Sequence, residues 1–196
     1  PDLPARLRLT LDREGRVECQ LTALPPAKAE WRVGLAEARL RSDNPWLTVK
    51  STRREVYDQA RAALPEGLDE VVFLNERGEV CDGTITTVFF DRGKGMRTPP
   101  LSCGLLPGVL RAELGCPEEV LLAEDLPKVR LWVGNALRGL IPATFSVWKY
   151  PRRRLLSQAV DTSGGDICTS MKGRGADLGG RARCIGAMKR LPAEGA

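Results

Sequence analysis

The side chains available for proton transfer set the first limits on the chemistry of this chain. Histidine is absent from its 196 residues. A Ser-His-Asp or Cys-His mechanism is therefore excluded, because the imidazole base is missing. Cysteine occurs six times, but no two cysteines form the C-x-x-C pair of a zinc or redox motif. Proton transfer near neutral pH must then use Lys, Asp, Glu, Tyr, Cys or a cofactor.

Lys50 and Asp82 are the first candidate groups. Lys50 stands just before a predicted helix over residues 52–64, and taken alone it is typical of a solvated surface lysine. Asp82 precedes Gly83 in a segment rich in β-branched residues, where the pair is equally typical of a hairpin turn. Neither residue predicts a site by itself.

Two glycine-containing turns are candidates for binding an anion. Gly108 precedes a predicted helix over residues 109–114, and a glycine at such a start lets backbone N–H groups face a phosphate, helped by the helix dipole. Gly134 and Asn135 lie in a predicted strand that runs into a turn, and an ordinary strand-to-helix turn has the same pattern.

The predicted elements alternate between strands and helices through residues 31–145, which indicates an α/β or α+β fold. Apolar and polar residues alternate around a Glu14-Gly15 turn, which predicts a hairpin over residues 7–21. Further strands are predicted at 31–40, at 118–126 running into a turn or short helix, and at 129–137. Val88, Phe89 and Phe90 are predicted to be core residues.

The basic charge of the chain lies at its C-terminal end. Residues 151–196 carry nine basic and four acidic side chains, which accounts for the whole net charge of +5. They show no sustained period, and we expect a flexible tail over 149–196. Its scattered charges and single aromatic neighbour, Tyr150, argue against specific nucleic-acid binding. No apolar run approaches the roughly 18 residues of a membrane span, and unpaired cysteines of this kind are typical of a cytoplasmic protein.

Three segments, in this order and spacing, resemble the class IV aminotransferase family of pyridoxal-phosphate enzymes (fold type IV). They are PWLTVKSTRREVYDQARA, LNERGEVCDGTITTVFFDRGKGMRTPPLSCGLLPGVLRAEL and LWVGNALRGLIPA. The approach to the lysine and the G-N-A-L ending are most similar to the 4-amino-4-deoxychorismate lyase branch. Branched-chain and D-amino-acid transaminases share the same framework.

The resemblance implies a division of the chain into three parts. Residues 29–148 resemble the C-terminal, cofactor-binding domain of the family. Residues 1–28 resemble only the last hairpin of its small N-terminal domain, which in the family carries an arginine that clamps the cofactor phosphate. The tail over 149–196 departs from the family. A homodimer acting on a small-molecule amino substrate is also implied.

The resemblance gives each candidate residue an expected role. Lys50 would form a Schiff base with pyridoxal 5′-phosphate and move protons at the substrate's α-carbon. Asp82 takes the place of a glutamate that pairs with the pyridine nitrogen, and its shorter side chain requires the ring to sit nearer by roughly 1 Å. Thr87 stands where the family usually has asparagine. Arg54 and Tyr57, four and seven residues after the lysine, could face the site, but an exposed helix face is the favoured expectation.

The phosphate would be held at two places. The backbone amides of Val109 and Leu110, after Gly108, resemble the family's first phosphate-binding turn, and Gly134-Asn135 resembles the second. The resemblance implies first a 4-amino-4-deoxychorismate lyase, which releases pyruvate and 4-aminobenzoate in folate synthesis. The alternative is a branched-chain or D-amino-acid transaminase, which the same residues would serve. The substitutions at Asp82 and Thr87 and the lack of the N-terminal domain also leave a non-catalytic remnant as an alternative.

Overall fold

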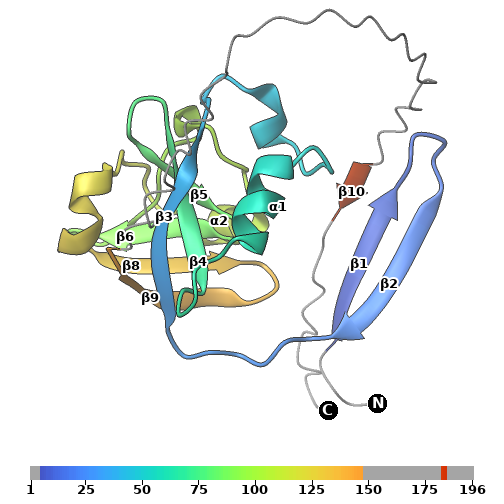
Figure 1. The fold of residues 1–196 in the computed structure, drawn as a ribbon, viewed down its shortest axis with the longest axis horizontal. Coiled ribbons are helices and arrows are strands. Elements are labelled where there is room, and N and C mark those ends of the chain that lie inside the picture. The colour runs from blue at the N-terminus through green and yellow to red at the C-terminus, as the bar shows by residue number, and fades with distance from the viewer. Residues whose placement is uncertain (1–4, 148–181, 185–196) are drawn as a thin grey trace, which may run out of the picture.

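The computed structural model describes residues 5–147 and the short segment 182–184 (Figure 1). The body is a seven-stranded mixed sheet with the strand order β5-β4-β3-β9-β8-β6-β7. Its strands are β3 (Trp31–Leu40), β4 (Glu70–Asn75), β5 (Val80–Gly83), β6 (Thr87–Asp91), β7 (Met96–Arg97), β8 (Arg130–Asn135) and β9 (Gly139–Phe145). Strand β3 is parallel to β4 and β9, and the other pairs are antiparallel.

One further pairing closes the sheet on itself. Strand β5, at one end of the strand order, pairs with β6, the last strand but one, through Asp82 and Thr87. The strands from β5 round to β6 therefore form a ring of hydrogen-bonded neighbours, with β7 added at its edge. Closure removes open sheet edges and brings residues from both ends of the strand order together. The pair that closes the ring contains two of the predicted site residues.

The core fills the inside of this ring and the space under the first helix. Every residue of β4 and β6 is buried, as expected for strands covered on both faces, and the predicted core residues Val88, Phe89 and Phe90 are confirmed. A second cluster forms where Phe73 packs against the helix α1 (Glu55–Ala62). The other helices are short: α2 (Val109–Leu114) and the 3₁₀ turns η1 (Pro45–Thr48), η2 (Leu101–Cys103) and η3 (Ala123–Lys128).

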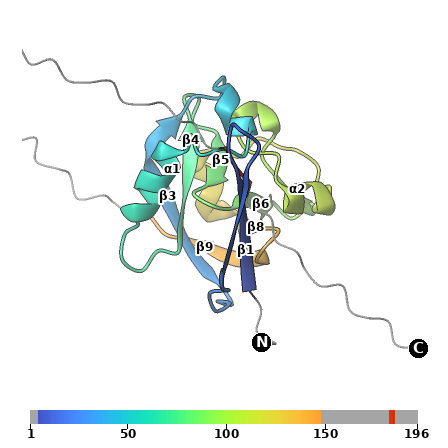
Figure 2. The same cartoon turned by 90° about the vertical axis from the view of Figure 1, so that its right-hand side faces the viewer.

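The predicted N-terminal hairpin is confirmed and belongs to a separate small sheet. Strands β1 (Ala5–Leu11) and β2 (Val17–Ala23) pair along their whole length, and β10 (Ala182–Cys184) pairs with the other edge of β1. The hairpin stands beside the body (Figure 1), and Figure 2 shows the molecule with the hairpin side facing the viewer. Apart from β10, the predicted tail over 149–196 lies outside the described residues.

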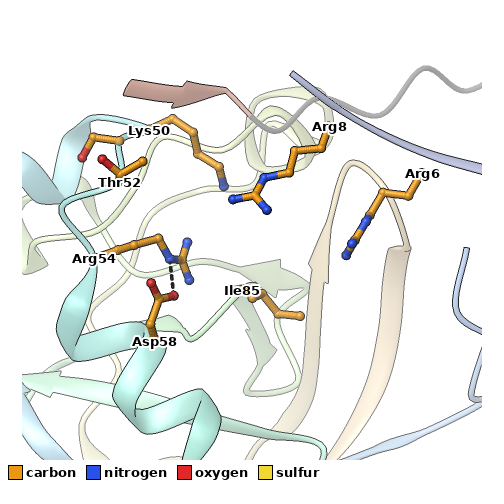
Figure 3. A pocket seen from close by; sticks show the side chains of 8 residues that line it. Arg6, Arg8, Lys50, Thr52, Arg54, Asp58 and Ile85 are labelled. Atoms are coloured by element: carbon orange, nitrogen blue, oxygen red, sulfur yellow. Dashed lines mark hydrogen bonds and ion pairs between the residues drawn. The ribbon is translucent and has the colours of Figure 1, made fainter. Parts of the chain in front are cut away.

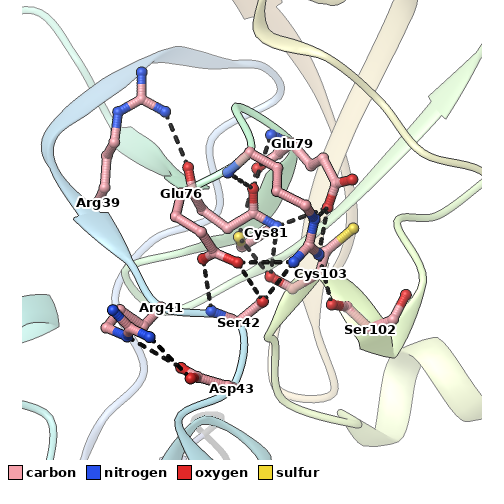
Figure 4. Close-up of polar contacts among 11 residues, drawn as sticks. Arg39, Arg41, Ser42, Asp43, Glu76, Glu79, Cys81, Ser102 and Cys103 are labelled. Atoms are coloured by element: carbon pink, nitrogen blue, oxygen red, sulfur yellow. Dashed lines mark hydrogen bonds and ion pairs between the residues drawn. The ribbon is translucent and has the colours of Figure 1, made fainter.

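A polar network ties the β4–β5 turn to η2 (Figure 4). The side chain of Arg77 contacts Glu76 and Glu79 and donates to the carbonyl oxygen of Ser102 at 2.9 Å. The amide of Asn75 donates to the carbonyl oxygen of Cys103 at 3.1 Å. These bonds fix the chain just before Leu105 and Leu106. Leu106 contributes its backbone N–H to the site described below.

Two predicted elements differ from the structure. The helix expected over 52–64 is shorter, α1, because residues 52–54 form a turn in which Arg54 N–H bonds to the carbonyl oxygen of Thr52. Within 118–126, the expected turn or short helix is present as η3, but the expected strand before it is wrong. Residues 118 and 122 make only isolated bridges, to Thr98 and Glu79, and then η3 begins. The segment thus bridges two different partners at single residues, and it does not run along either of them as a ladder.

Candidate functional site

Lys50 lies at the junction between η1 and α1, on the wall of a cavity of about 360 Å³. The Asn44-Pro45 sequence determines this junction locally, because the Asn44 side chain accepts from the Trp46 N–H and proline occupies the first helical position. Chain direction changes at Val49, which has extended backbone angles. The cavity is also lined by Arg54, which stands at the N-cap of α1, by Asp58 in α1 and by Ile85 (Figure 3).

Asp82 presents a buried carboxylate oxygen that has no partner in the described part of the chain. Its Oδ2 accepts from the Leu106 N–H at 2.8 Å, whereas Oδ1 is buried and unpaired. Burial raises the pKa of Asp82 to about 7, against the opposing effects of the Leu106 hydrogen bond and of the Lys50 and Arg111 charges. A buried acceptor without a donor is costly, which marks Oδ1 as a position for an N–H group that a ligand would bring.

Glu70 organises the turn between Asp82 and Thr87, and no motif pointed to it. Its fully buried carboxylate accepts from the N–H and hydroxyl of Thr84, from the Ile85 N–H and from the Thr86 hydroxyl. A charged residue directly before the apolar run VVFL is the signal in the sequence, since buried charge is rare unless it is satisfied.

The predicted phosphate-binding residues come together beside Thr87. Gly108 caps the N-terminus of α2 with extended backbone angles, and a Cβ at Gly108 would lie 3.4 Å from the Thr87 hydroxyl oxygen. A Cβ at Gly134 would lie 2.6 Å from Leu110 Cδ2, so the end of β8 touches the start of α2. Val109 is 62% exposed and is not part of the core. Its side chain therefore gives no indication of a packing role.

Asn135 has a structural task in this arrangement. Its side-chain amide donates to the Ile85 carbonyl at 3.0 Å, and its side-chain oxygen accepts from the N–H groups of Leu137 and Arg138. It therefore fixes the β8–β9 turn against the cavity wall. These bonds use the side-chain oxygen and one of the two N–H donors of the side-chain amide.

Replacing Gly134 with alanine is expected to destabilise the protein by about 1–3 kcal/mol, because the added methyl overpacks a tight site. The new Cβ would lie 2.5 Å from the Gly139 carbonyl oxygen and 2.6 Å from Leu110. Urea unfolding of the two proteins measures the difference. An unchanged free energy of unfolding would show that the β8–β9 turn can open at no cost.

The expectation of an exposed helix face for Arg54 and Tyr57 is wrong. Arg54 donates to the Thr84 carbonyl at 2.7 Å and to Asp58 at 2.8 Å, and it lines the cavity. The Tyr57 ring packs edge-on against Phe73, with 4.9 Å between the ring centres. The turn held by Glu70 supplies the Thr84 carbonyl, and β4 supplies Phe73. The position of these segments relative to α1 cannot be predicted from helical spacing.

The hairpin contributes two arginines that sequence reasoning did not assign to the site. Arg6 and Arg8 of β1 line the cavity that contains Lys50 (Figure 3). They are two residues apart in a strand, so their side chains share one face. The alternation of the strand predicts that Arg6 and Arg8 share a face. Only the placement of the hairpin beside the body shows that this face is turned toward Lys50.

Comparison with models of protein families shows to which family the chain belongs. A model of the family amino-transferase class IV matches residues 2–144. The chain belongs to this family of pyridoxal-phosphate-dependent enzymes, and the predicted fold class is confirmed. No curated protein matches the chain. Within the described residues, no helix is long and apolar enough to cross a membrane, and no cluster of three or more Cys, Asp or Glu side chains is arranged to hold a metal.

Solved structures agree with the family. A protein from Mesorhizobium loti described as an amino-acid aminotransferase is 46% identical, with a TM-score of 0.70 over 72% of this chain and 73% of that one. A protein from Legionella pneumophila described as a 4-amino-4-deoxychorismate lyase is 20% identical, with a TM-score of 0.62 over 70% and 56%. A branched-chain aminotransferase from Thermobaculum terrenum in its pyridoxal-phosphate form is 18% identical, with a TM-score of 0.54 over 67% and 49%. The last two show the fold alone, and the chain spans about half of their length.

Proposed function

We propose that this chain catalyses proton transfer at the α-carbon of a small amino substrate, with Lys50 as the residue that carries pyridoxal phosphate. The observation that supports this most is the unpaired, buried Oδ1 of Asp82, near enough to Lys50 for the lysine charge to lower the Asp82 pKa. The site therefore offers an amine and an acceptor for a ring N–H in one place, which is the pair of groups that the cofactor requires.

Each group of the chain has a distinct task in this proposal. When bound, pyridoxal phosphate supplies an electron sink next to the substrate's α-carbon. The Lys50 amine attaches the cofactor and then takes and returns the α-proton. Asp82 Oδ1 accepts the ring N–H and keeps that nitrogen protonated. The N–H groups of Val109 and Leu110 and the Gly134 turn bind the phosphate, with the Thr87 hydroxyl beside them.

Two observations bear on which reaction follows. The 46% identity to a protein described as an amino-acid aminotransferase favours amino-group transfer, and we place this reaction first. The motif around Lys50 favours the second candidate, a 4-amino-4-deoxychorismate lyase that would serve folate synthesis. A non-catalytic remnant is disfavoured. A buried, unpaired carboxylate at Asp82 destabilises the fold, and without a ligand to pair with it we would expect another residue at this position. The three-part division, the homodimer and the cytoplasmic location stay predictions.

A product assay separates the two reactions. The chain loaded with pyridoxal phosphate is incubated with an amino acid and a 2-oxo acid, and separately with 4-amino-4-deoxychorismate. We expect exchange of amino groups in the first mixture, measured by the new amino acid, and no pyruvate in the second. Release of pyruvate without exchange would instead establish the lyase. No product in either mixture, with correctly folded protein, would favour the non-catalytic remnant.

A further inference from the structure

The turn over residues 84–86 joins β5 to β6, the two strands whose pairing closes the ring. Four donors of this turn point to one carboxylate, that of Glu70. Its Oε1 accepts from the N–H and the hydroxyl of Thr84, at 3.0 and 2.5 Å. Its Oε2 accepts from the Ile85 N–H at 3.2 Å and from the Thr86 hydroxyl at 2.9 Å. The positions of these donors, and so the shape of the turn, are therefore defined by the Glu70 side chain.

The carbonyl oxygens of the same turn contact two other parts of the site. The Thr84 carbonyl accepts from Arg54 at 2.7 Å, and the Ile85 carbonyl accepts from the side-chain amide of Asn135 at 3.0 Å. Arg54 stands four residues after Lys50 and lines the same cavity. Asn135 ends β8, at the second predicted phosphate-binding turn. The turn thus joins the segment that follows Lys50 to the phosphate-binding side.

Glu70 also lies against the backbone next to Asp82. A Cβ at Gly83 would lie 2.8 Å from Glu70 Oε2 and 2.4 Å from the Thr86 hydroxyl oxygen. The residue after Asp82 therefore has to be glycine, because the carboxylate and the hydroxyl occupy the space that a side chain would need. A displacement of the Glu70 carboxylate would for this reason also displace the backbone that carries Asp82.

The charge of Glu70 is stabilised mainly by these hydrogen bonds. Among the described residues, Arg61 is the cation within ion-pair distance, at 3.6 Å from Oε1, and its side chain is 37% exposed. Arg61 donates instead to the Asp69 carbonyl at 2.7 Å. An apolar side chain can often replace a buried charge without loss of stability. What the carboxylate adds is a set of fixed acceptor positions for the turn, which an apolar side chain could not provide.

We infer that Glu70 is a positioning residue for the reaction, which acts through the turn at 84–86. It holds Asp82, the segment that follows Lys50 and the second phosphate-binding turn in one arrangement. The inference rests on the proposed function for the roles of Lys50 and Asp82. Glu70 itself takes no part in proton transfer, because its side chain is fully buried and is not among the groups that line the cavity.

Replacing Glu70 with glutamine tests the inference, because the amide keeps the size of the side chain but has one acceptor oxygen instead of two. On the full chain loaded with pyridoxal phosphate, E70Q should lower kcat about 10- to 100-fold, the effect of a small misplacement of reacting groups. KM for the amino substrate should change less than about threefold. T86V removes only the hydroxyl bond to Oε2 and should lower kcat about 2- to 10-fold, which keeps the test decisive if E70Q does not fold.

D91N is the matched control for E70Q. Asp91 is also a buried carboxylate that holds a turn, since its Oδ1 accepts from three backbone N–H groups between β6 and β7. It stands at the opposite end of β6 from Thr87, away from the site. D91N should therefore leave kcat nearly unchanged. An equal loss of kcat in E70Q and D91N would overturn the inference, as would an unchanged kcat in either E70Q or T86V.

Hydrogen exchange on the protein without cofactor provides a readout that is independent of turnover. In E70Q, the amide hydrogens of residues 84–86 should exchange at least about tenfold faster, and so should those of 54–58 and 135–138, which the turn contacts. Faster exchange confined to 84–86 would overturn the inference and leave the proposed function intact. Failure of the proposed function has a different signature. The unmodified chain would then lack a Lys50-dependent cofactor absorption band, while the coupled exchange in E70Q would remain.

Discussion

Replacing Lys50 with alanine is expected to lower kcat at least about 1,000-fold, because the residue both attaches the cofactor and transfers the α-proton. The variant should also lose the visible absorption band that pyridoxal phosphate develops when it is bound to a lysine. The fold should persist, since Lys50 lies on the wall of a cavity and outside both core clusters. Absorption spectra and steady-state kinetics on both proteins measure these effects.

The matched control for this experiment is K94A. Lys94 is exposed in the turn between β6 and β7, and only its backbone N–H is used, in a bond to Asp91. It should retain both the absorption band and the activity. If K50A kept the band, another lysine would carry the cofactor and the assignment of Lys50 would be wrong.

Replacing Asp82 with asparagine is expected to reduce kcat at least about 100-fold, while the cofactor still binds through Lys50 and the phosphate-binding turns. The amide has the size of the carboxylate but carries no charge, so it cannot keep the ring nitrogen protonated. D82E, which restores the residue usual in the family, should be more active than D82N. Equal activity of D82N and the unmodified chain would show that the ring nitrogen does not depend on residue 82.

The D82N variant also tests how the free energy of unfolding depends on pH in the protein without cofactor. Burial raises the Asp82 pKa from 3.8 to about 7, so between these values the folded state holds a proton that the unfolded state has lost. The free energy of unfolding should therefore fall as the pH rises from about 4 to about 7 and level off above that, an effect of a few kcal/mol at most. D82N should lack this part of the pH dependence. Urea unfolding across this range tests it, and an identical pH slope in both proteins would contradict it.

Local patterns predicted those parts of the fold that depend on neighbours in the chain. The alternation of apolar and polar residues around Glu14-Gly15 predicts the hairpin. A side-chain period of two and a glycine that can adopt the left-handed conformation (φ 84° at Gly15) are enough to define it. Gly115 ends α2 in the left-handed conformation, as its place after the helix predicts. The strand predicted at the start of 118–126 does not form, because a strand needs a partner along its length and this segment makes only isolated bridges. The turn or short helix predicted to follow it is η3.

The sequence by itself determined that histidine chemistry is excluded, that Lys50 precedes a helix, and that the ordered motifs are those of class IV aminotransferases. These properties depend on composition, order and short spacing. The tertiary structure alone decided that Asp82 pairs with Thr87 where the ring of strands closes, that Glu70 holds the turn between them, and that the hairpin turns Arg6 and Arg8 toward Lys50. The physical reason is that each of these contacts joins segments far apart in the chain, and their meeting depends on strand register and core packing.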